Sequence, residues 1–78
     1  MGDLVQHYAG LEFFRVYTGR SVHVIHVPRG QGEEVRAYLR GQGVASAMSP
    51  GTPAAYERIE VDRRVSAEAL QAVLDQQS

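Results

Sequence analysis

The segment Val22–Val27, VHVIHV, constrains the fold of this 78-residue chain more than any other stretch. Its β-branched residues are typical of a β-strand, in which successive side chains point to opposite faces of a sheet. Val22 and Val24 would then share one face of that sheet. Ile25 and Val27 would share the other face, so the strand is apolar on both sides and needs cover on both sides.

The preceding segment, Leu11–Tyr17 or LEFFRVY, is predicted to be the other strand of a hairpin, because it is rich in aromatic and β-branched residues. Phe13 and Tyr17 would lie on one of its faces. Phe14 and Val16 would lie on the other, so this strand is also apolar on both sides. Both faces of the hairpin are therefore expected to be covered by other parts of the structure, by a second copy or by a ligand.

Turn residues set the limits of the hairpin. Gly19 and Arg20 suit the two central positions of a tight turn that needs a positive φ at its first central residue. Pro28 is expected to end the second strand, because proline has no N–H to donate to a neighbouring strand.

A helix is predicted within residues 30–43, GQGEEVRAYLRGQG. Val35 and Leu39 are four residues apart and so lie on one face of a helix. Gly41 or Gly43 can supply the left-handed residue that commonly ends a helix.

The second half of the chain repeats the order strand, strand, helix. Ile59 and Val61 alternate with polar residues, as in a strand with one buried face, and Ser66 suits the N-cap of the last helix. The predicted segments are a short strand VASAM (44–48), a loop SPGTP (49–53), a strand AYERIEVDR (55–63) and a helix AEALQAVLDQQ (67–77).

The resulting order, ββαββα, predicts an α+β two-layer sandwich in a single domain, residues 1–78. Moving the last strand of a ferredoxin-like βαββαβ chain to its start gives this order. We therefore expect a permuted ferredoxin-like fold, with a mainly antiparallel four-stranded sheet in the order 1-2-4-3. Both helices would cover one face, and the crossovers would be right-handed. Residues 1–10 are expected to be a loose or helical N-terminal segment.

The sheet face away from the helices needs cover from residues 2–10, from a second copy of the chain, or from a ligand. We expect a homodimer, because a 78-residue chain without cysteine has few other sources of stability. The candidate interface residues are Phe13, Arg15, Tyr17, Val24 and His26.

The three histidines do not form a metal site in this reading. His23 and His26 are three apart, so a strand places them on opposite faces and they cannot bind one ion together. One would face the helices and the other the open sheet face, whereas His7 is not placed. No metal or cofactor is expected.

The turn PRGQGEE (28–34) is a weak candidate for an anion site, since a glycine-rich turn into a helix can bind phosphate through backbone N–H groups. It lacks the Walker lysine and the full G-x-G-x-x-G pattern. Glu33 and Glu34 would also repel a phosphate. We expect a loop and a helix cap, with Arg29 as the contact if an anion does bind.

Catalysis and nucleic-acid binding find little support. No serine–histidine–acid set can be assigned, and Glu60 and Asp62 have no apolar surroundings that would shift a pKa. Phe13, Arg15 and Tyr17 could stack on RNA bases from one strand face. However, the chain has no RNP1-like string and a net charge of −1.

Composition points to a cytoplasmic bacterial protein. No stretch of about 18 apolar residues is present, and the N-terminus lacks the basic and apolar regions of a signal peptide. All eight basic residues are arginine, a bias typical of a GC-rich bacterial genome.

From Tyr17 to residue 76 the chain resembles a family of small bacterial domains described as prokaryotic signal-transducing proteins. The similarity rests on a helix ending AYLRGQGV (Ala37–Val44), with Leu39, Gly43 and Val44 at the family's positions, and on a last helix opening SAEAL. The extra N-terminal strand and the strand HVIHV (23–27) depart from the family. The resemblance implies a small regulatory or interaction module and no site residues.

Our first hypothesis is a non-enzymatic binding or interaction module that self-associates through the open sheet face, with an unidentified protein as a further possible partner. The alternative is a small dimeric enzyme or ligand-binding protein with an apolar pocket between two sheets, in which His23 or His26 moves a proton.

Overall fold

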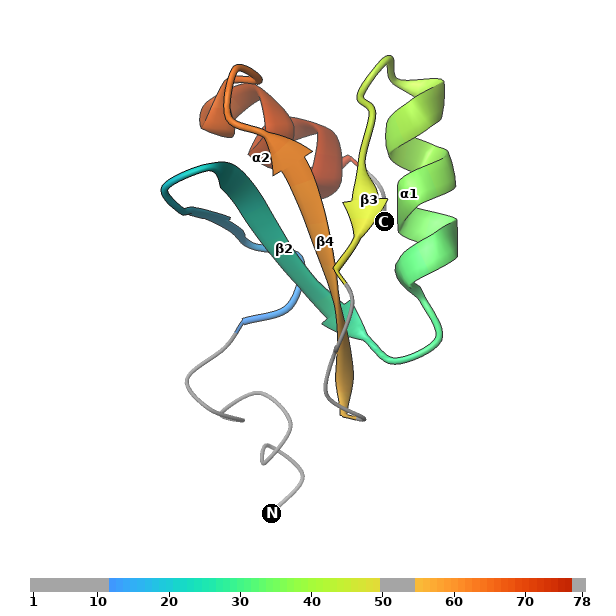
Figure 1. Cartoon of the computed structure of the whole chain (residues 1–78). Helices are drawn as coiled ribbons and strands as arrows, with labels where there is room; N and C mark the ends of the chain where they lie inside the picture. The colour runs from blue at the N-terminus through green and yellow to red at the C-terminus, as the bar shows by residue number, and fades with distance from the viewer. Residues whose placement is uncertain (1–11, 50–54, 77–78) are drawn as a thin grey trace.

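The computed structural model describes residues 12–49 and 55–76 (Figure 1). It contains a four-stranded sheet and two helices, and all three strand pairings are antiparallel. The sheet order is β1-β2-β4-β3, which confirms the α+β class and the predicted strand order. The predicted N-terminal segment and most of the predicted 49–53 loop lie outside the described residues. The elements are β1 (Val16–Thr18), β2 (Val22–Pro28), α1 (Gly32–Gly41), β3 (Ala47–Met48), β4 (Tyr56–Asp62) and α2 (Ala67–Asp75).

The hydrophobic core lies between the helices and one face of the two long central strands, β2 and β4. Ile25 and Ile59 pair at the centre of these strands, and both side chains are fully buried. Both helices contribute to the same core, so both cover the same face of the sheet. The buried members are Ile25, Val27, Val35, Leu39, Ile59, Val61, Leu70 and Leu74.

Helix α1 ends as predicted at a left-handed glycine. Gly43 has a φ of +85°, and its N–H donates to the Arg40 carbonyl at 3.0 Å. The Val44 N–H donates to the Leu39 carbonyl at 2.8 Å. These two bonds form a Schellman motif and show that Gly43, not Gly41, is the terminating residue.

Helix α2 begins as predicted at Ser66, whose Oγ accepts the Ala69 N–H at 3.2 Å. Ser66 has an extended backbone, the usual conformation of an N-cap residue. The cap starts the helix in the register that turns Leu70 and Leu74 into the core.

The first predicted strand, Leu11–Tyr17, is wrong in extent, because β1 covers only Val16–Thr18. Phe14 has a φ of +62°, a left-handed conformation that breaks an extended strand. Its N–H still donates to the His26 carbonyl at 2.8 Å, and its side chain packs against the core with Val16. Residues 12–15 therefore form a bend beside the sheet.

The predicted central residues of the turn are wrong. Thr18 pairs with His23, and the Gly19 N–H donates to the Val22 carbonyl at 2.8 Å, so Gly19 and Val22 continue the same register. Arg20 and Ser21 therefore lie at the tip, one residue further along the chain than predicted. Gly19 lies before the tip and is not among the residues with positive φ.

Both edges of the sheet are held by side chains from the helices. On β1, the Gln71 amide of α2 donates to the Phe14 carbonyl at 3.0 Å and accepts the Val16 N–H at 2.9 Å. Next to β3, Arg36 of α1 donates to the Ser46 carbonyl at 3.1 Å. The predicted strand 44–48 is accordingly reduced to the two residues of β3, with this contact directly before it.

Candidate functional site

The sheet face away from the helices carries a mixed aromatic and charged surface. Strand pairing places Tyr17 opposite Val24, Val24 opposite Glu60, and His26 opposite Arg58. Alternation along β4 places Tyr56 on the same face as Arg58 and Glu60. We call this surface the open face, defined by Tyr17, Val24, His26, Tyr56, Arg58 and Glu60.

His26 lies between two tyrosine rings at the middle of the open face. Its ring centroid lies 5.8 Å from that of Tyr17 and 5.2 Å from that of Tyr56, and both contacts are edge-to-face. Such contacts stabilise aromatic pairs beyond the area that they bury. His26 is only 8% exposed as a result of its surroundings, and its Nδ1 atom makes no hydrogen bond.

Burial lowers the pKa of His26 below its ordinary value, and the positive charge of Arg58 on the neighbouring strand lowers it further. Both effects disfavour the protonated imidazolium. His26 is therefore a neutral ring at neutral pH. Nδ1 is itself buried, so another molecule could bind this atom only after the side chains around it move.

Tyr17 gives the open face its exposed apolar area. It is 38% exposed and is the one large hydrophobic side chain classed as exposed within residues 12–49 and 55–76. Its hydroxyl accepts the Glu12 N–H at 3.2 Å, so one end of the side chain is fixed. Val24, directly opposite on β2, is 8% exposed.

Arg58 and Glu60 are the charged residues of the open face. They are two residues apart on β4, so both side chains point to the open face. The positive Arg58 and the negative Glu60 are therefore neighbours on that face. Arg58 is exposed and Glu60 is half-buried. Neither forms an ion pair with the part of the chain that the structure describes.

The structure brings together three of the five predicted interface residues, namely Tyr17, Val24 and His26. Phe13 and Arg15 do not share a strand face with Tyr17, because the strand begins only at Val16. Arg15 instead pairs with the exposed Glu12 at 3.1 Å.

Tyr56 was not among the predicted site residues. Alternation with Ile59 and Val61 puts it on the polar face of its strand, with Arg58 and Glu60. The predicted strand order already made β4 the neighbour of β2, so the signal for a Tyr56–His26 contact was present. What was missing was the register, which pairs Pro28 with Tyr56.

His23 faces the other side of β2, toward the helices, as the alternation predicted. It is 3% exposed. Its Nε2 lies 2.6 Å from the Val65 carbonyl, so Nε2 carries the hydrogen, and Nδ1 lies 3.0 Å from the Thr18 hydroxyl. These bonds tie β2 to β1 and to the connection before α2, which is a structural role.

The backbone at the start of α1 is bound by a carboxylate that the sequence did not suggest. Glu57 of β4 accepts the Gly32 N–H at 2.7 Å. Glu33 instead pairs with Arg36 at 2.9 Å. An anion would have to compete with the Glu57 carboxylate at this helix end, and the weak anion site at Arg29 stays a prediction.

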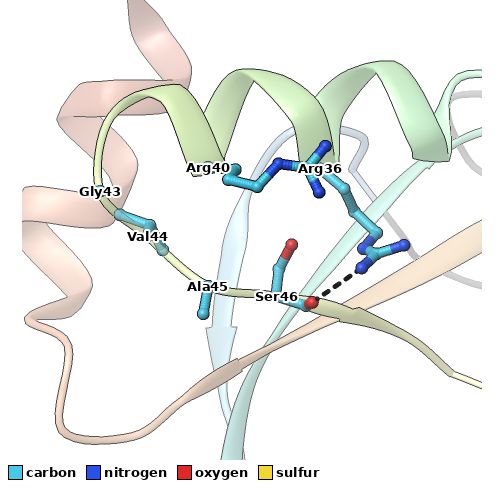
Figure 2. Close-up of a pocket in the computed structure, with 6 residues that line it drawn as sticks. All are labelled: Arg36, Arg40, Gly43, Val44, Ala45 and Ser46. Atoms are coloured by element: carbon cyan, nitrogen blue, oxygen red, sulfur yellow. Dashed lines mark hydrogen bonds between the residues drawn. The ribbon is translucent and has the colours of Figure 1, made fainter.

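A second surface feature is a groove between α1 and the segment that leads into β3 (Figure 2). Its volume is about 470 Å³. Figure 2 shows the Arg36 guanidinium bonded to the Ser46 carbonyl across the groove. The lining residues are Arg36, Arg40, Gly43, Val44, Ala45 and Ser46.

Within residues 12–49 and 55–76, no three histidine or carboxylate side chains are grouped closely enough to hold a metal ion. The same residues include no helix with the length and apolar character needed to cross a membrane. No family model, curated protein or solved structure matches this chain.

Proposed function

We propose that this chain is a small, non-enzymatic interaction module that self-associates through the open face, within a permuted ferredoxin-like arrangement. The observation that carries the proposal is the exposed Tyr17 beside Val24 and His26. Aromatic residues and arginine dominate the binding energy of protein interfaces. The open face supplies both, with two tyrosines and Arg58.

The size of the face indicates a weak, reversible association. β2 and β4 have seven residues each. At about 3.3 Å per residue and about 4.8 Å between strands, a four-stranded face offers at most roughly 450 Å² per partner. Stable interfaces bury about 1,200 Å² or more in total. We therefore expect a dissociation constant in the micromolar range.

The edge contacts support face-to-face association rather than edge-to-edge association. Pairing at an edge needs free backbone N–H and C=O groups. Gln71 already binds the backbone beside and within β1, and Arg36 binds the carbonyl before β3. A second copy would have to displace these side chains before it could extend the sheet.

The test is sedimentation velocity over a range of low to high micromolar concentrations, with wild type compared with Tyr17→Ser. We expect a concentration-dependent dimer that Tyr17→Ser weakens about tenfold or more, because the variant removes an exposed aromatic anchor. Tyr38→Ser is the control, since Tyr38 lies on α1 and away from the open face. A wild-type monomer throughout this range would refute self-association.

The second candidate is a ligand-binding or enzymatic dimer with a pocket between the two open faces. One observation favours it: His26 is a neutral imidazole on the open face, between the rings of Tyr17 and Tyr56. Native mass spectrometry of gently purified protein separates the two functions. A dimer of the chain's own mass supports the interaction module, whereas a dimer with additional bound mass supports the pocket and makes His26 the first residue to replace.

A further inference from the structure

We propose that the second copy packs on the open face with its β4 antiparallel to β4 of the first copy, so that Arg58 meets Glu60 of the partner subunit twice. This inference rests on the proposed self-association and adds its orientation. It follows from the charge pattern of β4, the strand arrangement and the environment of His26.

The two charges on the open-face side of β4, Arg58 and Glu60, favour one orientation of the second copy. Two equal sheet faces that pack on each other are related by a two-fold axis in the plane between them. If that axis runs across the strands, midway between Arg58 and Glu60, each residue lies opposite the other residue of the partner subunit. Both unpaired charges then gain an opposite partner.

The other simple orientation is unfavourable. An axis along β4 would place Arg58 opposite the partner's Arg58 and Glu60 opposite the partner's Glu60. Like charges held opposite each other at an interface oppose association. The charge pattern of β4 therefore selects between the two orientations.

Packing geometry is compatible with this axis. Residues two apart on a strand are separated by about 6.8 Å, so each lies only about 3.4 Å from the axis along the strand. Packed sheets commonly cross at about 30°, which displaces atoms near the axis very little. The axis also crosses β2 and β4 beside Ile25 and Ile59, near the middle of both strands. An axis through the middle gives the greatest overlap between the open faces of the two copies.

The same axis gives an apolar centre. Val24 pairs with Glu60 and His26 pairs with Arg58, so Val24 would lie opposite His26 of the partner subunit. A neutral histidine ring can make such a contact without the cost of burying a charge. The lowered pKa of His26 thus agrees with this arrangement.

Charge reversal tests the orientation. Arg58→Glu and Glu60→Arg each create two like-charge contacts, and we expect each to weaken dimerisation about tenfold or more. An equimolar mixture of the two variants should recover the wild-type affinity, because the mixed dimer restores both opposite-charge contacts. The double variant should recover it for the same reason. Arg20→Glu, in the β1–β2 loop, is the control for a charge change elsewhere.

The outcomes separate the two proposals. If wild type and Arg20→Glu dimerise but the mixture and the double variant fail to recover affinity, the orientation is wrong and self-association stands. If wild type is a monomer at every concentration, both proposals are wrong.

A cross-linking experiment covers the case in which a reversed charge disturbs folding. The chain has no cysteine, so a single introduced cysteine is unambiguous. Treated with a short bismaleimide, Arg58→Cys mixed with Glu60→Cys should form cross-links between the two variants in preference to cross-links within either one, since packed sheets lie about 10 Å apart, too far for a direct disulfide. Preferential cross-linking of Arg58→Cys to itself would overturn the antiparallel orientation.

Discussion

The carboxylate of Glu57 accepts the N–H of Gly32 at 2.7 Å and thereby joins the start of α1 to the central strand β4. Gly32 is buried, and a Cβ atom at this position would lie 2.6 Å from Glu57 Oε1 and 2.7 Å from Met48 Cε. The absence of a Cβ at residue 32 leaves room for the ends of the Glu57 and Met48 side chains, which lie directly against the start of α1.

Gly32→Ala is therefore expected to destabilise the fold. The added methyl group must displace the ends of the Met48 and Glu57 side chains. The flexible Met48 can move at little cost, but a displaced Glu57 loses its hydrogen bond to the N–H of residue 32, which costs about 1.5–3 kcal/mol for a charged acceptor. Urea unfolding followed by circular dichroism measures the change. Gly41→Ala is the control, because a Cβ there meets nothing within 4 Å and alanine favours helix. Equal stability of the two variants would contradict the close contact at Gly32.

Gln71→Ala should loosen β1. The variant leaves the Phe14 carbonyl and the Val16 N–H without their side-chain partner, at a cost of about 1–3 kcal/mol if water does not replace it. Amide hydrogen exchange of Val16 should accelerate more than that of Ile25. Gln76→Ala, at the end of α2, should leave both rates unchanged. Slow exchange of Val16 in Gln71→Ala would show that β1 is held by other contacts.

Stability should fall with acidification because of His26. Its pKa is lowered in the fold, so below its ordinary value of 6.5 the unfolded chain binds more protons at this site than the folded chain. The loss of stability begins as the pH falls through 6.5 and is complete at the lower, folded-state pKa. At neutral pH and above, the contribution is constant.

Urea unfolding at a series of pH values measures this effect at one protein concentration, so that self-association is held fixed. His26→Leu should remove the loss of unfolding free energy that His26 causes between pH 6.5 and its lower, folded-state pKa. Arg58→Gln should reduce it, because the Arg58 charge contributes to the lowered pKa. An unchanged pH profile in His26→Leu would show that other groups cause it.

Ser66→Ala should destabilise α2 by about 1 kcal/mol, because the Ala69 N–H loses its side-chain acceptor. Ser66→Asp should retain stability, since aspartate also accepts this bond and carries a charge that favours a helix N-terminus. Thermal unfolding of the three proteins provides the measurement. If Ser66→Ala unfolds at the same temperature as the wild type, the cap contributes little.

The elements set by local patterns were predictable. Ile59 and Val61 alternate with polar residues, and β4 forms as expected with both side chains buried. The helix ends followed from Ser66 and Gly43, whose roles depend on their own chemistry and on neighbours within five residues. The strand order followed from the sequence of elements.

The predictions that were wrong, and the site residues that were missed, depend on contacts between residues distant in the sequence. β1 starts only at Val16, after a left-handed backbone at Phe14 and beside the amide of Gln71, which is 57 residues from Phe14 along the chain. Propensity favours an extended conformation for phenylalanine, so no local signal marks this break. Glu57 at the start of α1 and Tyr56 beside His26 were missed for the related reason that register is a tertiary property.

Gln71 and Arg36 bind backbone groups beside the two outer strands of the sheet, and this has a consequence for the proposed dimer. A sheet with free edges can add strands and grow into a fibre. A copy that approached either edge of this sheet would first have to displace one of these side chains. If the chain self-associates through the open face as proposed, these two polar side chains would favour a closed pair over a growing sheet while taking no part in the interface.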